Sequence, residues 1–444
     1  MAPNTSHSCR NLVIYEVYVR NHGPNGTFAD VEADLPRLKA LGVDVVWFMP
    51  IHPIGKLNRK GSHGSPYSIQ DYRGVNPEYG SREDFTRLIE RAHALGLKVM
   101  IDVVYNHTSH DSVLVKEHPE YFNQDAQGHP VTTVPDWSDV IDLKHPNPAL
   151  TDYLVDTLVM WAQAGVDGFR CDVAPLVPID FWQQARAAVE KARPGVIWLA
   201  ESVHGGFIDS RRRRGLFAQS DSEIYAAFDL CYDYEIWPVF QQAVQGACPV
   251  LDYLEMLRFQ DFMYPENYVK MRCVENHDNW RILRLAPSRD QALAWTAFSA
   301  FNRGAFLIYG GQEAGAEHTP SLFEVDKIDW KDYPSQDFLS KLAHLKKDPA
   351  QVEGQLFLLA DAPAIQAAWQ HSSKSLYGVF NIAAAQGKVP VQLADGKYAD
   401  LINGGEVTVK KGKTTLPAQA AILRCAGLKS LKMLHCPLLD YHPQ

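Results

Sequence analysis

Groups of acidic, basic and histidine side chains follow four apolar runs of this sequence. Carboxyl groups and histidines can transfer protons or attack carbon, so these groups are candidates for one catalytic site. The four groups are Asp102-Val-Val-Tyr-Asn106-His107, Gly168-Phe-Arg170-Cys-Asp172, Glu201 and Asn276-His277-Asp278. If the runs are strands of one parallel barrel, their carboxyl ends meet in a single pocket.

Two of these acids have different sequence surroundings. Alternation along a strand places Arg170 on the same side as Asp172, and a neighbouring guanidinium favours the ionised form that a nucleophile needs. Glu201 follows the apolar run Val-Ile-Trp-Leu-Ala, where desolvation favours the protonated form of a general acid. An attacking carboxylate and a proton-donating carboxyl form the pair that glycoside hydrolysis uses. The alternative is a buried ion-pair network around Arg170 with a structural role.

Eight apolar runs are candidates for the strands that position these groups. Five of them follow an amphipathic helix that ends at a glycine, as at Gly42 and Gly96, which is typical of tight helix-to-strand connections. Apolar runs that alternate with helices predict a parallel sheet, and no G-x-G-x-x-G follows the first run. We therefore expect an α/β fold, a (β/α)8 TIM barrel. The runs are residues 12–19, 43–48, 97–102, 166–172, 196–200, 223–230, 268–274 and 305–309.

The connections predict the domain organisation. The long strand-to-helix links lie on the active-site face of a barrel, and residues 106–146 are long enough to form a small subdomain inserted after strand 3. We expect a catalytic barrel over residues 1–350. Short alternating runs with turn residues between them predict a C-terminal antiparallel β-sandwich domain over residues 351–425. The tail, residues 426–444, shows no period and is assigned no role.

Composition argues against several partners. The formal net charge of −9 disfavours nucleic acid, and the run of four arginines at 211–214 is expected to be a solvated helix or loop face. We expect no membrane segment, because residues 292–310 are interrupted by Asn302 and Arg303, and the N-terminus does not resemble a secretory signal. Seven cysteines without a C-x-x-C pair favour free thiols in a cytoplasmic protein and no metal site. The oligomeric state is open.

The four groups resemble, in order and strand placement, the four conserved regions of the α-amylase family, glycoside hydrolase family 13. The segment from Ser65-Pro-Tyr67 to Gly80 is similar to the second-loop signature of that family, and Val-Ile-Asp142-Leu143 to the motif that closes its inserted subdomain. The resemblance covers roughly residues 11–425. It implies a retaining hydrolase that cleaves α-1,4-glucosidic bonds of maltodextrins or starch-type α-glucans.

The resemblance also implies residue roles. Asp172 would be the nucleophile, Glu201 the general acid/base and Asp278 the acid that stabilises the oxocarbenium-like transition state. The first two carboxyls would lie about 5–5.5 Å apart. Substrate would be bound by Tyr67, His107, Arg170 and His277, with Asp102 and Asn106 as structural support.

No cofactor is implied as a requirement, but a structural calcium is an open alternative to which Asn106 could contribute. Many α-amylases of the family carry a Lys-His pair soon after the nucleophile, where this chain has Val-Ala-Pro-Leu176. The leaving-group side of the site must therefore be built differently here.

Other activities stay open. One alternative is an α-glucosidase or neopullulanase-type hydrolase, and another is a glucanotransferase or sugar isomerase that uses the same glucosyl-enzyme intermediate. A more distant alternative is a non-catalytic carbohydrate-binding or transporter-associated barrel. The presence of Asp172, Glu201 and Asp278 together favours catalysis.

Overall fold

The computed structural model describes residues 5–428 and 431–437. Eight parallel strands close into a barrel in the order β1-β10-β9-β8-β7-β6-β3-β2, which confirms the predicted (β/α)8 fold. Their residues are nearly all buried, as expected for a parallel sheet covered by helices. The strands are β1 (Val13–Val17), β2 (Val45–Phe48), β3 (Lys98–Val103), β6 (Gly168–Cys171), β7 (Ile197–Ala200), β8 (Leu230–Tyr232), β9 (Lys270–Arg272) and β10 (Ala305–Tyr309).

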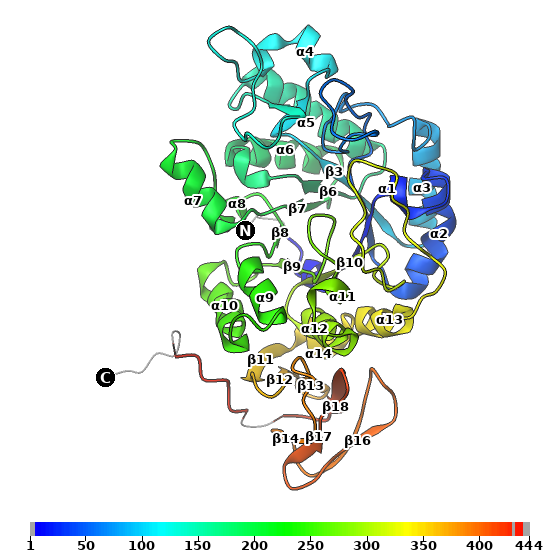
Figure 1. Ribbon diagram of the computed structural model, residues 1–444, viewed down its shortest axis with the longest axis vertical. Coiled ribbons are helices and arrows are strands. Elements are labelled where there is room, and N and C mark those ends of the chain that lie inside the picture. Colours follow the sequence, from blue (N-terminus) through cyan, green and yellow to red (C-terminus); the bar gives the residue numbers. More distant parts are fainter. Residues whose placement is uncertain (1–4, 429–430, 438–444) are drawn as a thin grey trace. The chain divides into compact units, whose positions relative to one another are not determined.

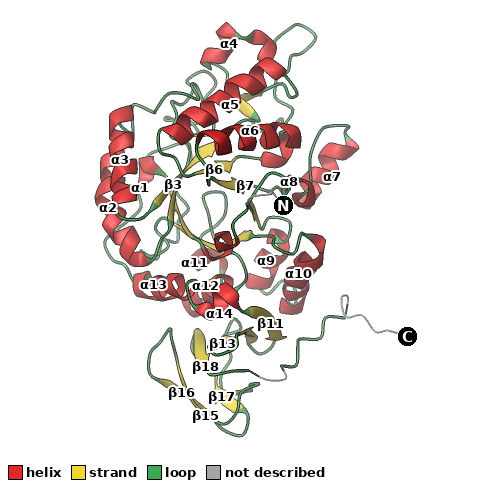
Figure 2. Ribbon diagram, turned by 180° about the vertical axis from the view of Figure 1, so that it is seen from behind, coloured by secondary structure: helices red, strands yellow, loops and turns green. Residues whose placement is uncertain are grey.

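The described chain forms two compact units. The first consists mainly of residues 14–232 and 320–329, and the second mainly of residues 7–13, 233–319 and 330 onward. In the first unit, helices α2, α3, α5 and α6 lie around strands β3, β6 and β7 (Figures 1 and 2). The helical segments of this unit are α1 (Val19–His22), α2 (Phe28–Leu41), α3 (Arg82–Ala94), α4 (Val113–Glu117), η2 (Pro119–Tyr121), α5 (Pro148–Gln163), η3 (Ala174–Leu176), α6 (Ile179–Ala192), α7 (Gly205–Arg213) and α8 (Asp221–Ile224).

Local sequence explains why these helices begin and end where they do. Thr27 and Asp30 form a reciprocal capping box at the start of α2, and Ser81 and Asp84 do the same for α3. Helix α2 ends at Gly42, whose φ of 101° lies in the left-handed region that glycine enters without strain. The connection to β2 is therefore short.

The segment after β3 contains the inserted subdomain. Strand β4 (His107–Ser109) pairs antiparallel with β5 (Val140–Asp142), and His107 lies opposite Asp142. The subdomain thus begins directly at the end of a barrel strand. This position brings its residues to the mouth where the strands end.

The second unit contains the last two barrel strands and the C-terminal β domain. Its described helices are η1 (His7–Asn11), α9 (Trp237–Val244), α10 (Val250–Met263), α11 (Ile282–Leu285), α12 (Arg289–Phe301), α13 (Gln336–Leu345) and α14 (Pro349–Glu353). None of the helices in the described part of the chain combines the length and apolarity that crossing a membrane requires.

The C-terminal β domain is antiparallel, as predicted. One sheet has the order β11-β12-β13-β18, and two strand pairs are β14 with β17 and β15 with β16. Side chains of both layers share one apolar cluster, in which Tyr377 and Leu423 of the sheet pack with Val389 and Val409 of the pairs. The strands are β11 (Gln355–Ala360), β12 (Ile365–Gln370), β13 (Ser375–Phe380), β14 (Lys388–Pro390), β15 (Gly396–Ala399), β16 (Glu406–Val409), β17 (Lys413–Thr415) and β18 (Ala420–Cys425).

The strand predicted over residues 223–230 is wrong. Ser220 and Glu223 form a capping box that starts the short helix α8, and the barrel strand β8 begins only at Leu230. Ser-x-x-Glu is a helix-start pattern that the sequence displays. The apolar residues after it were assigned to a strand because periodicity alone does not separate short buried helices from strands.

Candidate active site

The ends of three neighbouring strands bring the predicted site residues together. Strand β6 lies between β3 and β7, and its register pairs Asp102 with Arg170 and Cys171 with Ala200. Asp172 and Glu201 follow these last two residues directly, so they leave adjacent strands at the same level. The barrel register therefore places both acids at one mouth of the first unit.

Arg170 is the centre of this group. Its Nη1 lies 2.8 Å from Asp102 Oδ1 and 3.1 Å from Asp172 Oδ1, and its Nη2 lies 3.1 Å from Glu201 Oε2. Burial alone would lower the pKa of Arg170, but the carboxylates of Asp102 and Glu201 raise it well above its usual value. The guanidinium is therefore a permanent cation that three carboxyl groups share.

The environment of Glu201 differs from the sequence-based expectation. We expected an apolar setting, yet the carboxyl contacts Arg170 and also accepts a hydrogen bond of 2.7 Å from the backbone N–H of Val173. The apolar residues before Glu201 lie in the strand, whereas its side chain points toward polar groups of the next strand. Glu201 is buried, as expected, but one guanidinium contacts both acids.

The hydrogen bond to Glu201 depends on an unusual backbone conformation. Val173 has φ 36° and ψ 45°, in the left-handed region that β-branched residues rarely adopt. Such a conformation costs about 1–3 kcal/mol and concentrates at functional sites. Because Val173 directly follows Asp172, this turn links the backbone after the first acid to the carboxyl of the second.

Aromatic side chains surround the guanidinium. The rings of Trp47, Tyr67 and Tyr232 lie 5.2, 5.6 and 5.3 Å from the Arg170 guanidinium carbon, distances suited to cation–π contact. Tyr67 is half-buried, and its hydroxyl donates to Asp102 Oδ2 over 3.0 Å. The sequence interpretation missed Trp47 and Tyr232.

His107 lies beside the proposed nucleophile. Its Nε2 is 3.8 Å from Asp172 Oδ2, its Nδ1 is 3.2 Å from Asn106 Nδ2, and its ring packs 5.1 Å from that of Trp137. Burial lowers the pKa of His107 to about 4. The ring is therefore neutral near pH 7, where it can form a hydrogen bond without adding charge.

The fourth group belongs to the second unit. Asn276 Oδ1 accepts the backbone N–H of Asp278 over 3.0 Å, and Asn276 Nδ2 donates to Tyr234 Oη over 2.7 Å. His277 is buried with its Nε2 3.3 Å from Asp278 Oδ2, whereas the Asp278 side chain is 40% exposed. Tyr234, which the sequence interpretation did not select, thus helps to fix the turn that presents Asp278. The approach of Asp278 to Asp172 and Glu201 stays a prediction.

Two family models match the chain. The model of the α-amylase catalytic domain covers residues 19–137 and 135–354, and that of the bacterial α-amylase C-terminal domain covers residues 358–423. The chain belongs to the α-amylase family. It is thus an enzyme of carbohydrate metabolism that acts on glycosidic bonds.

Solved structures of α-amylases resemble this family member over nearly its whole length. An α-amylase from Lactobacillus plantarum is 44% identical with a TM-score of 0.91, and the match covers 95% of this chain and 100% of that one. The maltogenic α-amylase AmyB from Thermotoga neapolitana is 33% identical with a TM-score of 0.83, over 94% and 99% of the two chains.

A transferase is also similar to part of this α-amylase family chain. The α-1,4-glucan:maltose-1-phosphate maltosyltransferase of Cereibacter sphaeroides is 37% identical over 198 residues, which are 40% of this chain. The match spans only 33% of that curated relative. Family membership therefore leaves hydrolysis and transfer as separate candidates.

The residues around Asn106 do not fit the structural calcium that the family resemblance left open. Calcium prefers six to eight oxygen ligands. The nearby carboxylate of Asp142 already accepts hydrogen bonds from Thr132 Oγ1, Thr133 N and Thr133 Oγ1, and the guanidinium of Arg211 donates to Thr133 Oγ1. Within residues 5–428 and 431–437, no three His, Cys, Asp or Glu side chains are placed to share a metal ion.

Buried histidines predict a loss of stability in acid. Burial lowers the pKa of His52 to about 4, so its folded ring stays neutral while the unfolded ring is protonated below its ordinary value of 6.5. Its contribution to the free energy of unfolding is complete above pH 6.5 and is lost as the pH falls toward 4. We expect His52→Gln to remove about 3 kcal/mol of this pH dependence. Urea unfolding of both proteins between pH 7 and 4 measures it, and parallel profiles would contradict it.

Proposed function

We propose that this enzyme is a retaining glycoside hydrolase that cleaves α-1,4-glucosidic bonds of maltodextrins or starch-type α-glucans. The observation that carries the proposal is the contact of one buried guanidinium with both Asp172 and Glu201 at adjacent strand ends. This shared contact is compatible with the short spacing of about 5–5.5 Å between the carboxyls of a retaining enzyme. The similar α-amylase structures support the same substrate class.

The proposed reaction has two steps. In the first, a carboxylate oxygen of Asp172 forms a bond to the anomeric carbon while Glu201 gives its proton to the departing glycosidic oxygen. In the second, Glu201 takes a proton from water, whose oxygen displaces Asp172 from the sugar. Arg170 orients Asp172 Oδ1, which keeps the attacking carboxylate in place.

Six further residues complete the proposal. His277, the neutral His107 and the half-buried Tyr67 bind the glucose unit, and Asp278 stabilises the positive charge that develops on the ring. The hydrogen bonds of Asp102 to Tyr67 and Arg170 support a positioning role for that carboxylate. Asn106 supports His107 in the same way.

Transfer is the second candidate function. The glucosyl-enzyme ester can be attacked by a sugar hydroxyl in place of water, and the similarity to a maltosyltransferase favours keeping this outcome open. Both reactions use the same first step. They differ in which acceptor the leaving-group side of the site binds after that step.

Product analysis separates these candidates. We expect chromatography to show only sugars shorter than the substrate in reactions with maltotriose and amylose, with α-1,4 bonds cleaved, and no cleavage of pullulan. In the maltotriose reaction, products longer than maltotriose would identify a transferase. Cleavage of pullulan would indicate a neopullulanase-type enzyme. The absence of new products from all three substrates would contradict the proposed function.

A further inference from the structure

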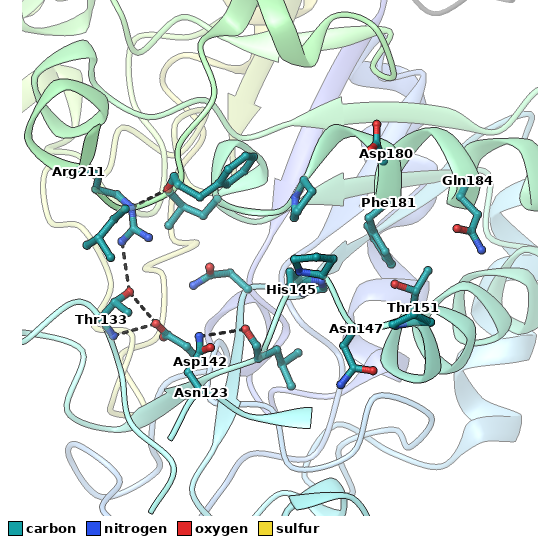
Figure 3. A pocket seen from close by; sticks show the side chains of 18 of the residues that line it. Asn123, Thr133, Asp142, His145, Asn147, Thr151, Asp180, Phe181, Gln184 and Arg211 are labelled. Carbon is teal, nitrogen blue, oxygen red and sulfur yellow. Dashed lines mark hydrogen bonds between the residues drawn. The ribbon is translucent and has the colours of Figure 1, made fainter. Parts of the chain in front are cut away.

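The first unit contains a cavity beside the inserted subdomain. Its volume is about 750 Å³, within the range of about 300–1,000 Å³ that is common for ligand sites. Among the residues assigned to the catalytic site, only Asn106 lines it. The walls come from the end of β5, the start of α5, helix α6 and the residues at 211–217 (Figure 3).

Many polar side chains line the cavity, and the lining as a whole does not carry a net positive charge. Asp142, Asp152 and Asp180 line the cavity together with one guanidinium, that of Arg211, and this excess of carboxylates disfavours anions. Its amide and hydroxyl side chains can both donate and accept hydrogen bonds, and those of Asn123, Asn147 and Thr133 already form some of these bonds within the protein. The amide and hydroxyl residues are Asn106, Asn123, Thr133, Asn147, Thr151 and Gln184.

Apolar faces lie between these polar groups. Phe181 and Phe217 line the cavity together with Pro146 and Pro178, and Phe217 is 48% exposed. An aromatic ring of this size that stays exposed offers a flat apolar contact to a ligand. A sugar ring has both an apolar C–H face and a rim of hydroxyls, which matches this lining.

Arg211 gives the cavity a directed donor. Its residue is only 7% exposed, contrary to the solvated face expected for the arginine run. Nε donates to the Phe217 carbonyl over 3.0 Å and Nη1 to Thr133 Oγ1 over 3.3 Å. Figure 3 shows the guanidinium at the edge of the cavity, held by these two bonds.

We propose that this cavity is a second carbohydrate site, which binds a short α-glucan segment apart from the catalytic acids. The inference rests on the proposed glucan substrate. Leu176 lines the cavity and packs in the same apolar cluster as Val173, the residue after Asp172. A glucan held here is therefore tethered near the acids, which raises the local concentration of its cleavable bonds.

The test uses a double variant of two exposed lining residues, Gln184→Ala with Phe217→Ala. Both side chains are exposed, so we expect wild-type folding. The KM for amylose should rise about tenfold, while kcat and KM for a chromogenic maltotrioside should stay within about twofold. Phe262→Ala is the matched control, because Phe262 is 59% exposed on α10 and does not line the cavity.

Direct binding distinguishes this inference from the proposed function. Electrophoresis through a gel that contains amylose should retard the wild-type protein and the Phe262→Ala control more than the double variant. If the wild-type protein cleaves neither substrate, the proposed function fails. Retardation in the gel still shows whether the cavity binds amylose. Equal retardation of the double variant and the wild-type protein, or an unchanged KM for amylose, would overturn the inference.

Discussion

Replacing Asp172 by asparagine is expected to lower turnover of maltoheptaose by about 10⁴-fold or more, because the amide cannot form the sugar ester. The amide oxygen of the variant can still accept the contact from Arg170 that Asp172 Oδ1 makes over 3.1 Å. We therefore expect the folded structure and the affinity for maltoheptaose to persist. Steady-state kinetics and calorimetric binding measure the two effects separately.

A surface carboxylate provides the control. Asp337 lies in the first turn of α13 and forms an exposed ion pair with Lys341. Asp337→Asn makes the same chemical change and should leave turnover within about twofold of the wild-type value. Exposed ion pairs of this kind contribute little to the free energy of unfolding. Turnover above a tenth of the wild-type value in Asp172→Asn would exclude this residue as the nucleophile.

Arg170→Met is expected to lower the free energy of unfolding by about 3–5 kcal/mol and to abolish turnover. Arg170 is fully buried and contacts Asp102, Asp172 and Glu201. Methionine fills much of the same volume but leaves three carboxyl groups without their shared cation. Urea unfolding at pH 7 measures the stability, and activity on maltotriose measures the turnover.

An exposed arginine separates this effect from a general loss of charge. Arg213 pairs with Asp209 over 2.8 Å, and both side chains are largely exposed. Arg213→Met should change the free energy of unfolding by about 1 kcal/mol or less. Equal, small changes in the two variants would show that the buried network does not depend on Arg170.

The sequence contains enough information for the barrel and for part of the site. Strands β2, β3 and β7 each follow a helix with a glycine (Gly42, Gly96 or Gly195) at or shortly after its end, and each strand is short, mostly apolar and mostly buried. The local sequence pattern and the position in the fold therefore agree. Asp102, Arg170, Asp172 and Glu201 lie together because the carboxyl ends of parallel strands meet. This grouping follows from topology once the strands are assigned.

Contacts between strands were not predictable from one strand at a time. Alternation placed Arg170 beside Asp172, but the arginine side chain is long enough to reach Glu201 on the next strand as well. The strained turn at Val173 was also missed, because no local pattern predicts a β-branched residue in the left-handed region. The environment of Glu201 depends on both features.

The surroundings of Arg170 were missed for two reasons. Tyr232 lies in β8, whose position was misassigned to residues 223–230, so its ring was not expected in the barrel. Trp47 lies in a correctly predicted strand, but parity alone does not say which side chain of β2 reaches Arg170. Both contacts depend on how several strands are arranged in the barrel, which the sequence of one strand does not determine.

The anomeric form of the first product tests the central proposal most directly. If Asp172 and Glu201 act in two displacement steps, proton NMR of a maltoheptaose digest should show the newly formed reducing ends first as the α-anomer, added to the anomers that the substrate already contains. The β-anomer of these new ends then forms only by mutarotation. Initial release of the β-anomer would mean a single displacement by water. That result would contradict an ester on Asp172, and with it the account of this site.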